Sequence, residues 1–155
     1  MDQENPSSSL PITIRPMVDG DFNFVVMTWL KANQWSPDAI AMGVNRDKSA
    51  LQRYWTGCER LVQRLVEKTS VTVAEAEMDG SKVIAGYVCH EDDAVIHYLL
   101  SRRKMQNFGI AKSLMQPFMD VAPGEVIYTF RPAVRGLKVP DHFRYDPYRA
   151  LLWLK

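Results

Sequence analysis

Cysteine is scarce in this chain, which has two in 155 residues, and neither has the spacing of a metal-ligand cluster. A small disulfide scaffold and a cysteine-based zinc site are therefore excluded, and Cys58 and Cys89 suit a reducing compartment as buried thiols. No apolar run approaches the length that a membrane helix requires. Residues 1–10 lack the hydrophobic stretch of a signal peptide. We expect a cytoplasmic protein with no metal and no membrane contact.

An excess of charge of one sign is also missing, since the formal net charge is +1. Its distribution is uneven: residues 1–100 hold nine Lys and Arg against 14 Asp and Glu, whereas residues 101–155 hold ten against four. Either the two halves differ by chance, or the second half faces a polyanion such as the phosphates of CoA or a nucleic acid. Because zinc-finger, helix-turn-helix and RNP-type patterns are absent, the sequence favours CoA over nucleic acid.

The length allows one domain with a full core and is short for two. Residues 1–10, rich in Ser, Pro and acidic or amide side chains, predict a flexible tail, and residues 11–155 predict a single domain. Asp19 or Asp21 is expected to cap a first helix, and Asp79-Gly80 to form a hairpin turn. Apolar periodicity predicts strands at 12–16, 71–76, 83–89, 94–100 and 126–129, helices at 22–30, 47–68 and from 111 to Pro117 or Pro123, and irregular chain at 33–45.

The segment Gln106-Asn107-Phe108-Gly109-Ile110-Ala111 carries the clearest chemical signal. It follows an expected strand and a basic turn, and it opens an expected helix. The first N–H groups of a helix have no backbone partner, and the helix dipole favours negative charge there. A glycine in this turn lets the backbone approach a ligand closely. These features together predict a site for a pyrophosphate.

The spacing Gln-x-x-Gly-x-Ala at this place resembles the acyl-CoA loop of the GNAT N-acetyltransferase superfamily, and the element order over residues 12–130 is similar to a GNAT domain. The resemblance implies a mixed, mostly antiparallel central sheet flanked by helices, an α/β (α+β) fold, with the acyl-CoA loop between the fourth strand and the third helix. It implies acetyl-CoA as cosubstrate. Backbone groups of Leu99, Leu100 and Ser101 would pair with pantetheine, and the loop would hold the pyrophosphate through Gln106, Asn107, Phe108, Gly109, Ile110 and Ala111.

The resemblance weakens after residue 129. The Asn of the family's next helix and the family's Gly-Phe pair are missing from the sequence, and a helix started by Pro132 would be cut short by Gly136 and Pro140. This shortened end is similar to small GNAT-like proteins of phages and prophages.

Five side chains are candidates for the proton transfers of acyl transfer. His97 lies on the strand before the loop and is either the base or a packed strand residue bonded to a neighbour. Glu91 and Asp93 are the next choices for the base. Tyr145 or Tyr148 would protonate the departing thiolate, or simply pack.

Two functions remain open. The first is transfer of an acetyl group from acetyl-CoA to an amine of a small molecule, peptide or protein. The second is a catalytically silent GNAT-fold protein that acts as a structural or interaction component, for example of a viral particle or against a host factor. A homo-oligomer or a protein partner is compatible with both.

Overall fold

The structure is a computed structural model that describes residues 11–92, 94–119, 124–131 and 138–155, apart from the side chains of residues 106 and 107. The expected tail at 1–10 and the helix that Pro132 would start lie outside these residues, as does Asp93. The elements, in chain order, are β1 (Ile12–Pro16), η1 (Asp19–Asp21), α1 (Phe22–Gln34), α2 (Pro37–Ala41), α3 (Lys48–Lys68), β2 (Ser70–Met78), β3 (Ser81–Glu91), β4 (Val95–Ser101), η2 (Arg103–Phe108), α4 (Ile110–Met119), β5 (Val126–Tyr128), β6 (Phe143–Tyr145) and η3 (Pro147–Leu154).

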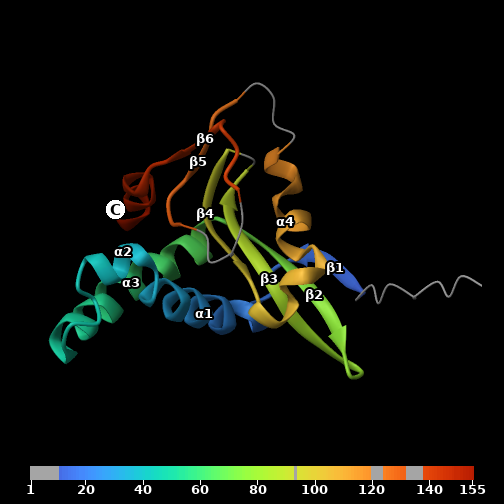
Figure 1. Ribbon diagram of the computed structural model, residues 1–155, viewed down its shortest axis with the longest axis horizontal. Helices are drawn as coiled ribbons and strands as arrows, with labels where there is room; N and C mark the ends of the chain where they lie inside the picture. The colour runs from blue at the N-terminus through green and yellow to red at the C-terminus, as the bar shows by residue number, and fades with distance from the viewer. Residues whose placement is uncertain (1–10, 93, 120–123, 132–137) are drawn as a thin grey trace, which may run out of the picture.

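All six strands form one mixed sheet in the order β1-β2-β3-β4-β5-β6 (Figure 1). The pairs from β1 to β4 are antiparallel, and β4–β5 and β5–β6 are parallel. The hairpin between β2 and β3 turns at Asp79 and Gly80, whose φ values of 52° and 77° are those of a type I′ turn. The expected fold class and the expected hairpin turn are therefore confirmed.

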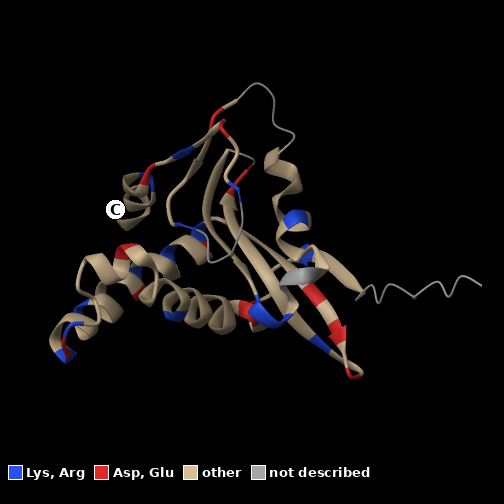
Figure 2. Cartoon of the chain, in the orientation of Figure 1, with Lys and Arg blue, Asp and Glu red and all other residues tan. Residues whose placement is uncertain are grey.

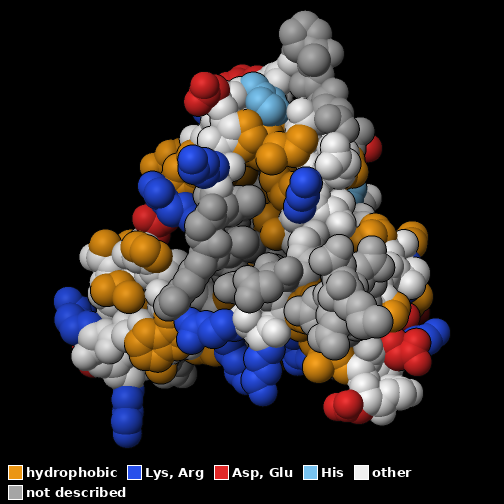
Figure 3. Space-filling view, turned by 45° about the vertical axis from the view of Figure 1, so that its right-hand side comes forward, with side chains coloured by type: hydrophobic (Ala, Val, Ile, Leu, Met, Phe, Trp, Pro, Cys, Tyr) orange, Lys and Arg blue, Asp and Glu red, His pale blue; other side chains and the backbone are white. Residues whose placement is uncertain are grey.

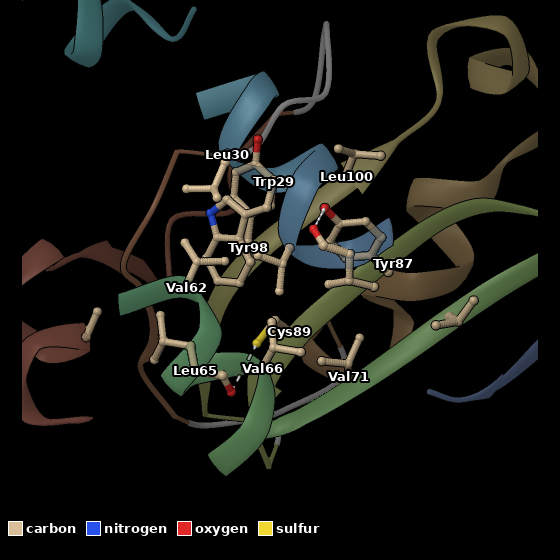
Figure 4. Close-up of a cluster of buried hydrophobic side chains, with 14 residues drawn as sticks. Trp29, Leu30, Val62, Leu65, Val66, Val71, Tyr87, Cys89, Tyr98 and Leu100 are labelled. Carbon is tan, nitrogen blue, oxygen red and sulfur yellow. Dashed lines mark hydrogen bonds between the residues drawn. The ribbon is translucent and has the colours of Figure 1, made fainter. Parts of the chain in front are cut away.

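The two faces of the sheet carry separate cores. On one face α1 and α3 pack against the sheet, where Trp29 of α1 and Leu65 of α3 join Tyr87, Cys89 and Tyr98 of the strands in one core (Figure 4). Burial raises the pKa of the Cys89 thiol to about 12, as expected for an unreactive core residue. On the other face α4 covers a smaller cluster with Ile110, Leu114 and Phe118 at its centre (Figure 1).

Most expected elements are present, and five short ones were not predicted, the first being η1 at Asp19–Asp21. The stretch 33–45 contains α2, where the Ser36 hydroxyl caps the helix by accepting from the Ala39 N–H at 3.1 Å. Because of α2, the expected third helix is the fourth, α4. The basic turn forms the 3-10 helix η2, and the C-terminal region forms β6 and η3.

The expected start of α3 is confirmed, whereas the expected side-chain cap of α1 is not present. Asp47 caps α3, since its carboxylate accepts from the Ala50 N–H at 2.8 Å. Asp21 does not cap α1 with its side chain; it accepts from the Val18 N–H and pairs with Arg15 at 2.7 Å. Within the described residues, no helix is both long and apolar enough to cross a bilayer.

Gly86, in the middle of β3, brings three elements together. A Cβ atom at this position would lie 2.5 Å from the Leu100 carbonyl oxygen, 2.9 Å from Cγ2 of Ile110 and 3.3 Å from Cα of Ser101. Only glycine lets the start of α4 rest on the end of β4 at this distance. Gly86, which lies outside the loop, therefore permits the close packing between the end of β4 and the start of α4.

Gly86→Ala should lower the free energy of unfolding by about 1–3 kcal/mol, because the backbone carbonyl of Leu100 cannot move away cheaply. The matched control is Gly57→Ala in α3, where a Cβ meets nothing within 4 Å and should stabilise the helix by up to about 1 kcal/mol. Thermal unfolding followed by circular dichroism measures both, with about 2–4 °C per kcal/mol for a chain of this size. Equal shifts of the same sign would contradict the close-contact argument.

Candidate functional site

The strands β4 and β5 pair over a short length and then separate. Their register joins Val95 to Ile127 and Ile96 to Tyr128, and the Thr129 N–H donates to the Ile96 carbonyl at 3.0 Å. In the described part of the chain, no strand pairs with this edge of β4 beyond Ile96. We call this divergence the fork.

Aromatic packing explains why β5 leaves the sheet at this point. Phe130, two residues after the strand, packs edge-on against Trp29 at 5.2 Å and against Tyr98 at 6.2 Å, between ring centroids. Both partners belong to the core on the α1 face. The chain after Thr129 is therefore drawn toward α1 and away from the remainder of β4.

A bulge in β4 decides which backbone groups face the fork. Cys89 pairs with Tyr98 and His90 pairs with Ile96, so that His97 is the extra residue. The Arg102 N–H donates to the Ala85 carbonyl at 2.8 Å. In an antiparallel pair the hydrogen-bonded positions alternate.

Since Arg102 and Ala85 form a hydrogen-bonded pair, the alternation makes Leu100 and Tyr87 the next hydrogen-bonded pair along the strands. The N–H and C=O groups of Leu99 and Ser101, which lie between such pairs, point away from β3. Leu99 and Ser101 therefore present backbone donors and acceptors toward the fork, as expected. The expectation for Leu100 is corrected, because its backbone faces β3.

The start of α4 lies beside the Ser101 end of this edge, since Gly86 contacts both. Gly109 has a φ of 71°, in the left-handed region, and a Cβ there would meet nothing within 4 Å. The Ser113 N–H donates to the Gly109 carbonyl at 3.0 Å as the first bond of the helix. The N–H groups of Ile110, Ala111 and Lys112 therefore have no partner within α4, and the space over Gly109 is open.

Basic side chains surround this helix start. Arg102, Arg103, Lys104 and Lys112 are exposed, and Figure 2 shows blue residues at the turn between β4 and α4. The Arg102 guanidinium lies over the Phe24 ring at 5.3 Å, which holds it between α1 and the end of β4. Among the other loop residues expected to bind, Phe108 is partly exposed, Ile110 is buried under the helix, and Ala111 is half-buried. The side chains of Gln106 and Asn107 lie outside the described part.

His97 is fully buried, and both of its ring nitrogens have partners. Nε2 lies 2.7 Å from Glu91 Oε2, and Nδ1 lies 2.9 Å from the Thr129 hydroxyl. Glu91 in turn accepts from Arg149 at 2.8 Å and from the Trp153 indole N–H at 3.2 Å. The network thus joins β3, β4, the residue after β5 and η3.

The charge states within this network follow from burial and hydrogen bonding. Burial lowers the pKa of His97 below its ordinary 6.5, and the Glu91 carboxylate offsets only part of this. Burial alone would raise the pKa of Glu91, but bonds from Trp153 and His97 and the Arg149 charge hold that pKa below its ordinary 4.5. At neutral pH a neutral His97 therefore donates from Nε2 to an ionised Glu91 and accepts at Nδ1 from Thr129.

The expected catalytic side chains are thus not gathered at the fork as free groups. His97 matches the packed interpretation, and Glu91 is occupied by three donors. Tyr145 lies on β6, and its ring packs at a tilt against Tyr128, with 5.2 Å between centroids, and under the Arg131 guanidinium at 5.0 Å. Burial raises the pKa of Tyr145. Tyr148 is 76% exposed at the start of η3.

The sequence analysis missed Thr129, Arg149 and Trp153. Their role arises from contacts across 32 to 62 residues of chain, for which a single sequence carries no periodic signal.

The comparisons with known proteins bear on the fold alone. No protein-family model matches the chain, and no curated protein matches it. Among solved structures, it is similar to the solution structure of the apo form of YjaB from Escherichia coli. The TM-score is 0.52 at 19% identity, over 76% of this chain and 69% of that one. At this identity the likeness supports the mixed sheet with flanking helices and says nothing of activity.

The His97 network should make stability depend on pH. Because the folded pKa of His97 is lowered, the unfolded chain takes up its proton first, and unfolding becomes easier as pH falls below 6.5. Glu91, with a lowered pKa as well, adds a second loss as pH falls below 4.5. We expect urea unfolding at pH 7 and pH 5 to show this fall in wild type and a smaller one in His97→Gln.

The control for this measurement is His142→Gln, which removes a histidine outside the network. Its Nε2 lies near the Phe118 carbonyl, on the opposite side of the sheet from α1. A fall between pH 7 and pH 5 that is the same in His97→Gln as in wild type would show that His97 titrates alike in both states.

Proposed function

We propose that this protein is an acetyl-CoA-dependent N-acetyltransferase of the GNAT superfamily. The observation that supports this best is the fork. A strand edge with outward-facing amide groups at Leu99 and Ser101 leads to the start of α4, where the amides between Gly109 and Ser113 have no partner within the helix. The strand edge would suit the pantetheine arm of CoA, and the adjacent helix start would suit its pyrophosphate.

The pantetheine arm suits the strand edge. It contains two amide groups in an extended chain, which can add to β4 as a short further strand, with N–H donors and C=O acceptors matched. From Ser101 back to Ile96 the edge spans about 16 Å at roughly 3.3 Å per residue. The thioester would then lie toward the closed end of the fork.

The pyrophosphate suits the start of α4. Amides without helical partners, the positive end of the helix dipole and four exposed basic side chains all favour a double negative charge there. Gly109 leaves room for the phosphate oxygens to approach the backbone.

Acyl transfer at this site requires little from side chains. The acceptor amine attacks the thioester carbon, the C–S bond breaks, and the proton lost by nitrogen ends on the thiolate. A backbone N–H on the β4 edge, such as that of Leu99, would polarise the carbonyl. Because both nitrogens of His97 are engaged, the amine would lose its proton to solvent or to a group of the acceptor. The acceptor class, a small molecule, a peptide or a protein side chain, stays open, and we place the reaction in the cytoplasm.

A second function is favoured by the same network. His97 and Glu91 are held by structural bonds, and Tyr145 is packed between Tyr128 and Arg131. A GNAT-fold protein that binds CoA without turnover, or that serves as a structural component of a larger particle, has no need of free proton-transfer groups.

Acetyl-CoA should bind to the purified protein, and Gly109→Trp should weaken binding by about 10- to 100-fold, since charge-assisted hydrogen bonds to the pyrophosphate are each worth about 1.5–3 kcal/mol. Gly80→Trp is the matched control, with the same positive φ and equally open space in the distant β2–β3 hairpin. Titration calorimetry measures both variants. Absence of binding in wild type, or equal weakening by both variants, would exclude this cofactor site.

Turnover should appear as free thiol released from acetyl-CoA in the presence of an acceptor amine. His97→Ala should change kcat of the folded protein far less than the roughly 100- to 10,000-fold that loss of a general base causes. A loss of that size with unchanged KM would make His97 the base after all. Binding of acetyl-CoA with no thiol release across small amines, peptides and proteins would favour the silent function.

A further inference from the structure

The Glu91 carboxylate, at the end of β3, is held by donors from two other elements. Its Oε2 atom accepts from His97 Nε2 of β4 at 2.7 Å and from the indole N–H of Trp153 at 3.2 Å. Its Oε1 atom accepts from the Arg149 guanidinium of η3 at 2.8 Å. The Glu91 side chain is only 18% exposed, so water cannot replace these donors cheaply. The position of Glu91 against His97 therefore depends on η3.

Arg149 supplies the positive charge of this network. In the described part of the chain, Arg149 has no ion pair other than the one with Glu91. Burial raises the pKa of Glu91, and the bonds from Trp153 and His97 together with the Arg149 charge more than offset this rise. Without Arg149 the Glu91 carboxylate would take up a proton more readily. Because His97 already donates from Nε2, a proton on Glu91 would break their bond or force His97 to move its proton to Nδ1.

The bond between Glu91 and His97 bears on the bulge in β4. His97 is the extra residue of the bulge and is fully buried, so its ring needs polar partners at that position. If His97 instead paired with β3, the strand after it would slip by one residue. The N–H and C=O groups of Leu99 and Ser101 would then face β3 and leave the fork. The edge that we assign to acyl-CoA is therefore present only while His97 stays in the bulge.

We propose that Arg149 is a positioning residue for acyl-CoA binding. It holds Glu91 against His97 and so keeps the bulge in place. The backbone groups of Leu99 and Ser101 thereby stay turned toward the fork. This inference rests on the proposed function, in which that edge binds the pantetheine arm. Arg149 acts through Glu91 and His97 and needs no contact of its own with the cofactor.

Calorimetric titration of the full chain with acetyl-CoA tests this role. Arg149→Leu removes the guanidinium and should weaken acetyl-CoA binding by about 3- to 10-fold, because coupled groups of one network contribute on this scale. Arg149→Lys restores the positive charge and should bind closer to wild type than to Arg149→Leu. Equal binding by wild type and Arg149→Leu would overturn the role of Arg149 and leave the proposed function intact. A wild type that binds no acetyl-CoA would overturn both.

The matched control is Arg144→Leu on β6. The face shown in Figure 3 carries basic side chains at several places, so a general loss of positive charge must be separated from the loss of Arg149. Arg144 pairs with Glu125 and Asp146, outside the His97 network. Arg144→Leu should therefore bind acetyl-CoA like wild type. A loss equal to that of Arg149→Leu would show an effect of net charge alone and overturn the proposal.

Hydrogen exchange of the ligand-free protein separates positioning from general destabilisation. The Leu100 N–H, which faces β3, should exchange about 10-fold faster in Arg149→Leu, because the bulge opens locally. The amide of Val73, in the middle of β2, should keep its wild-type rate. Equal acceleration at both sites would indicate a loss of stability alone and overturn the proposal. If Arg149→Leu does not fold, Trp153→Phe, which removes one donor to Glu91 and keeps an aromatic ring in the core, replaces it with the same expected outcomes.

Discussion

The extra residue at His97 is the feature on which the rest of this structure depends. The bulge shifts the alternation of β4 by one residue, so that the backbone groups of Leu99 and Ser101 turn from β3 to the open side. The same residue bonds to Thr129, the last point at which β5 is attached to β4. The bulge therefore sets what the exposed edge offers and holds the last attached residue of β5, while Phe130 draws the following chain toward α1.

The C-terminal region is attached to the sheet through the same residue. Glu91 links His97 to Arg149 and Trp153 of η3, and Trp153 with Ala150 covers the core beside α3. Charge, packing and strand register are thus coupled: a change in the ionisation of this network acts on the fork and on η3 together. The buried position of His97 follows from this architectural role, and it is the physical reason for assigning the chemistry of the site to backbone amides.

Sequence patterns predicted the long regular elements because burial on one face leaves a periodic trace. The strands β2 to β4 and the helix α3 came from such traces, whereas the Asp79-Gly80 turn came from its local Asp-Gly sequence. The helix α2 carried a local signal, Ser36 before Pro37, which was overlooked. The strand β6 is three residues long and has too little alternation to be recognised.

The candidate site was predictable only where it is local in sequence. Gly109 and the start of α4 follow from six adjacent residues, whereas the role of Leu100 was wrong because the direction of its backbone depends on a bulge between two strands. The partners of His97 are Glu91 of β3 and Thr129, just after β5, and Glu91 is bound in turn by two residues of η3, which was not predicted. Register and long-range partners are properties of the folded chain and are not encoded in the spacing of any one segment.

The most direct test of this account is a titration of ¹⁵N-labelled protein with acetyl-CoA, followed by the backbone amide resonances. The account predicts that Leu99, Ser101 and Gly109 shift together, and that Leu100, whose N–H faces β3, shifts less than its two neighbours. Saturating acetyl-CoA without shifts at Leu99 and Ser101, or with the largest shift at Leu100, would contradict it.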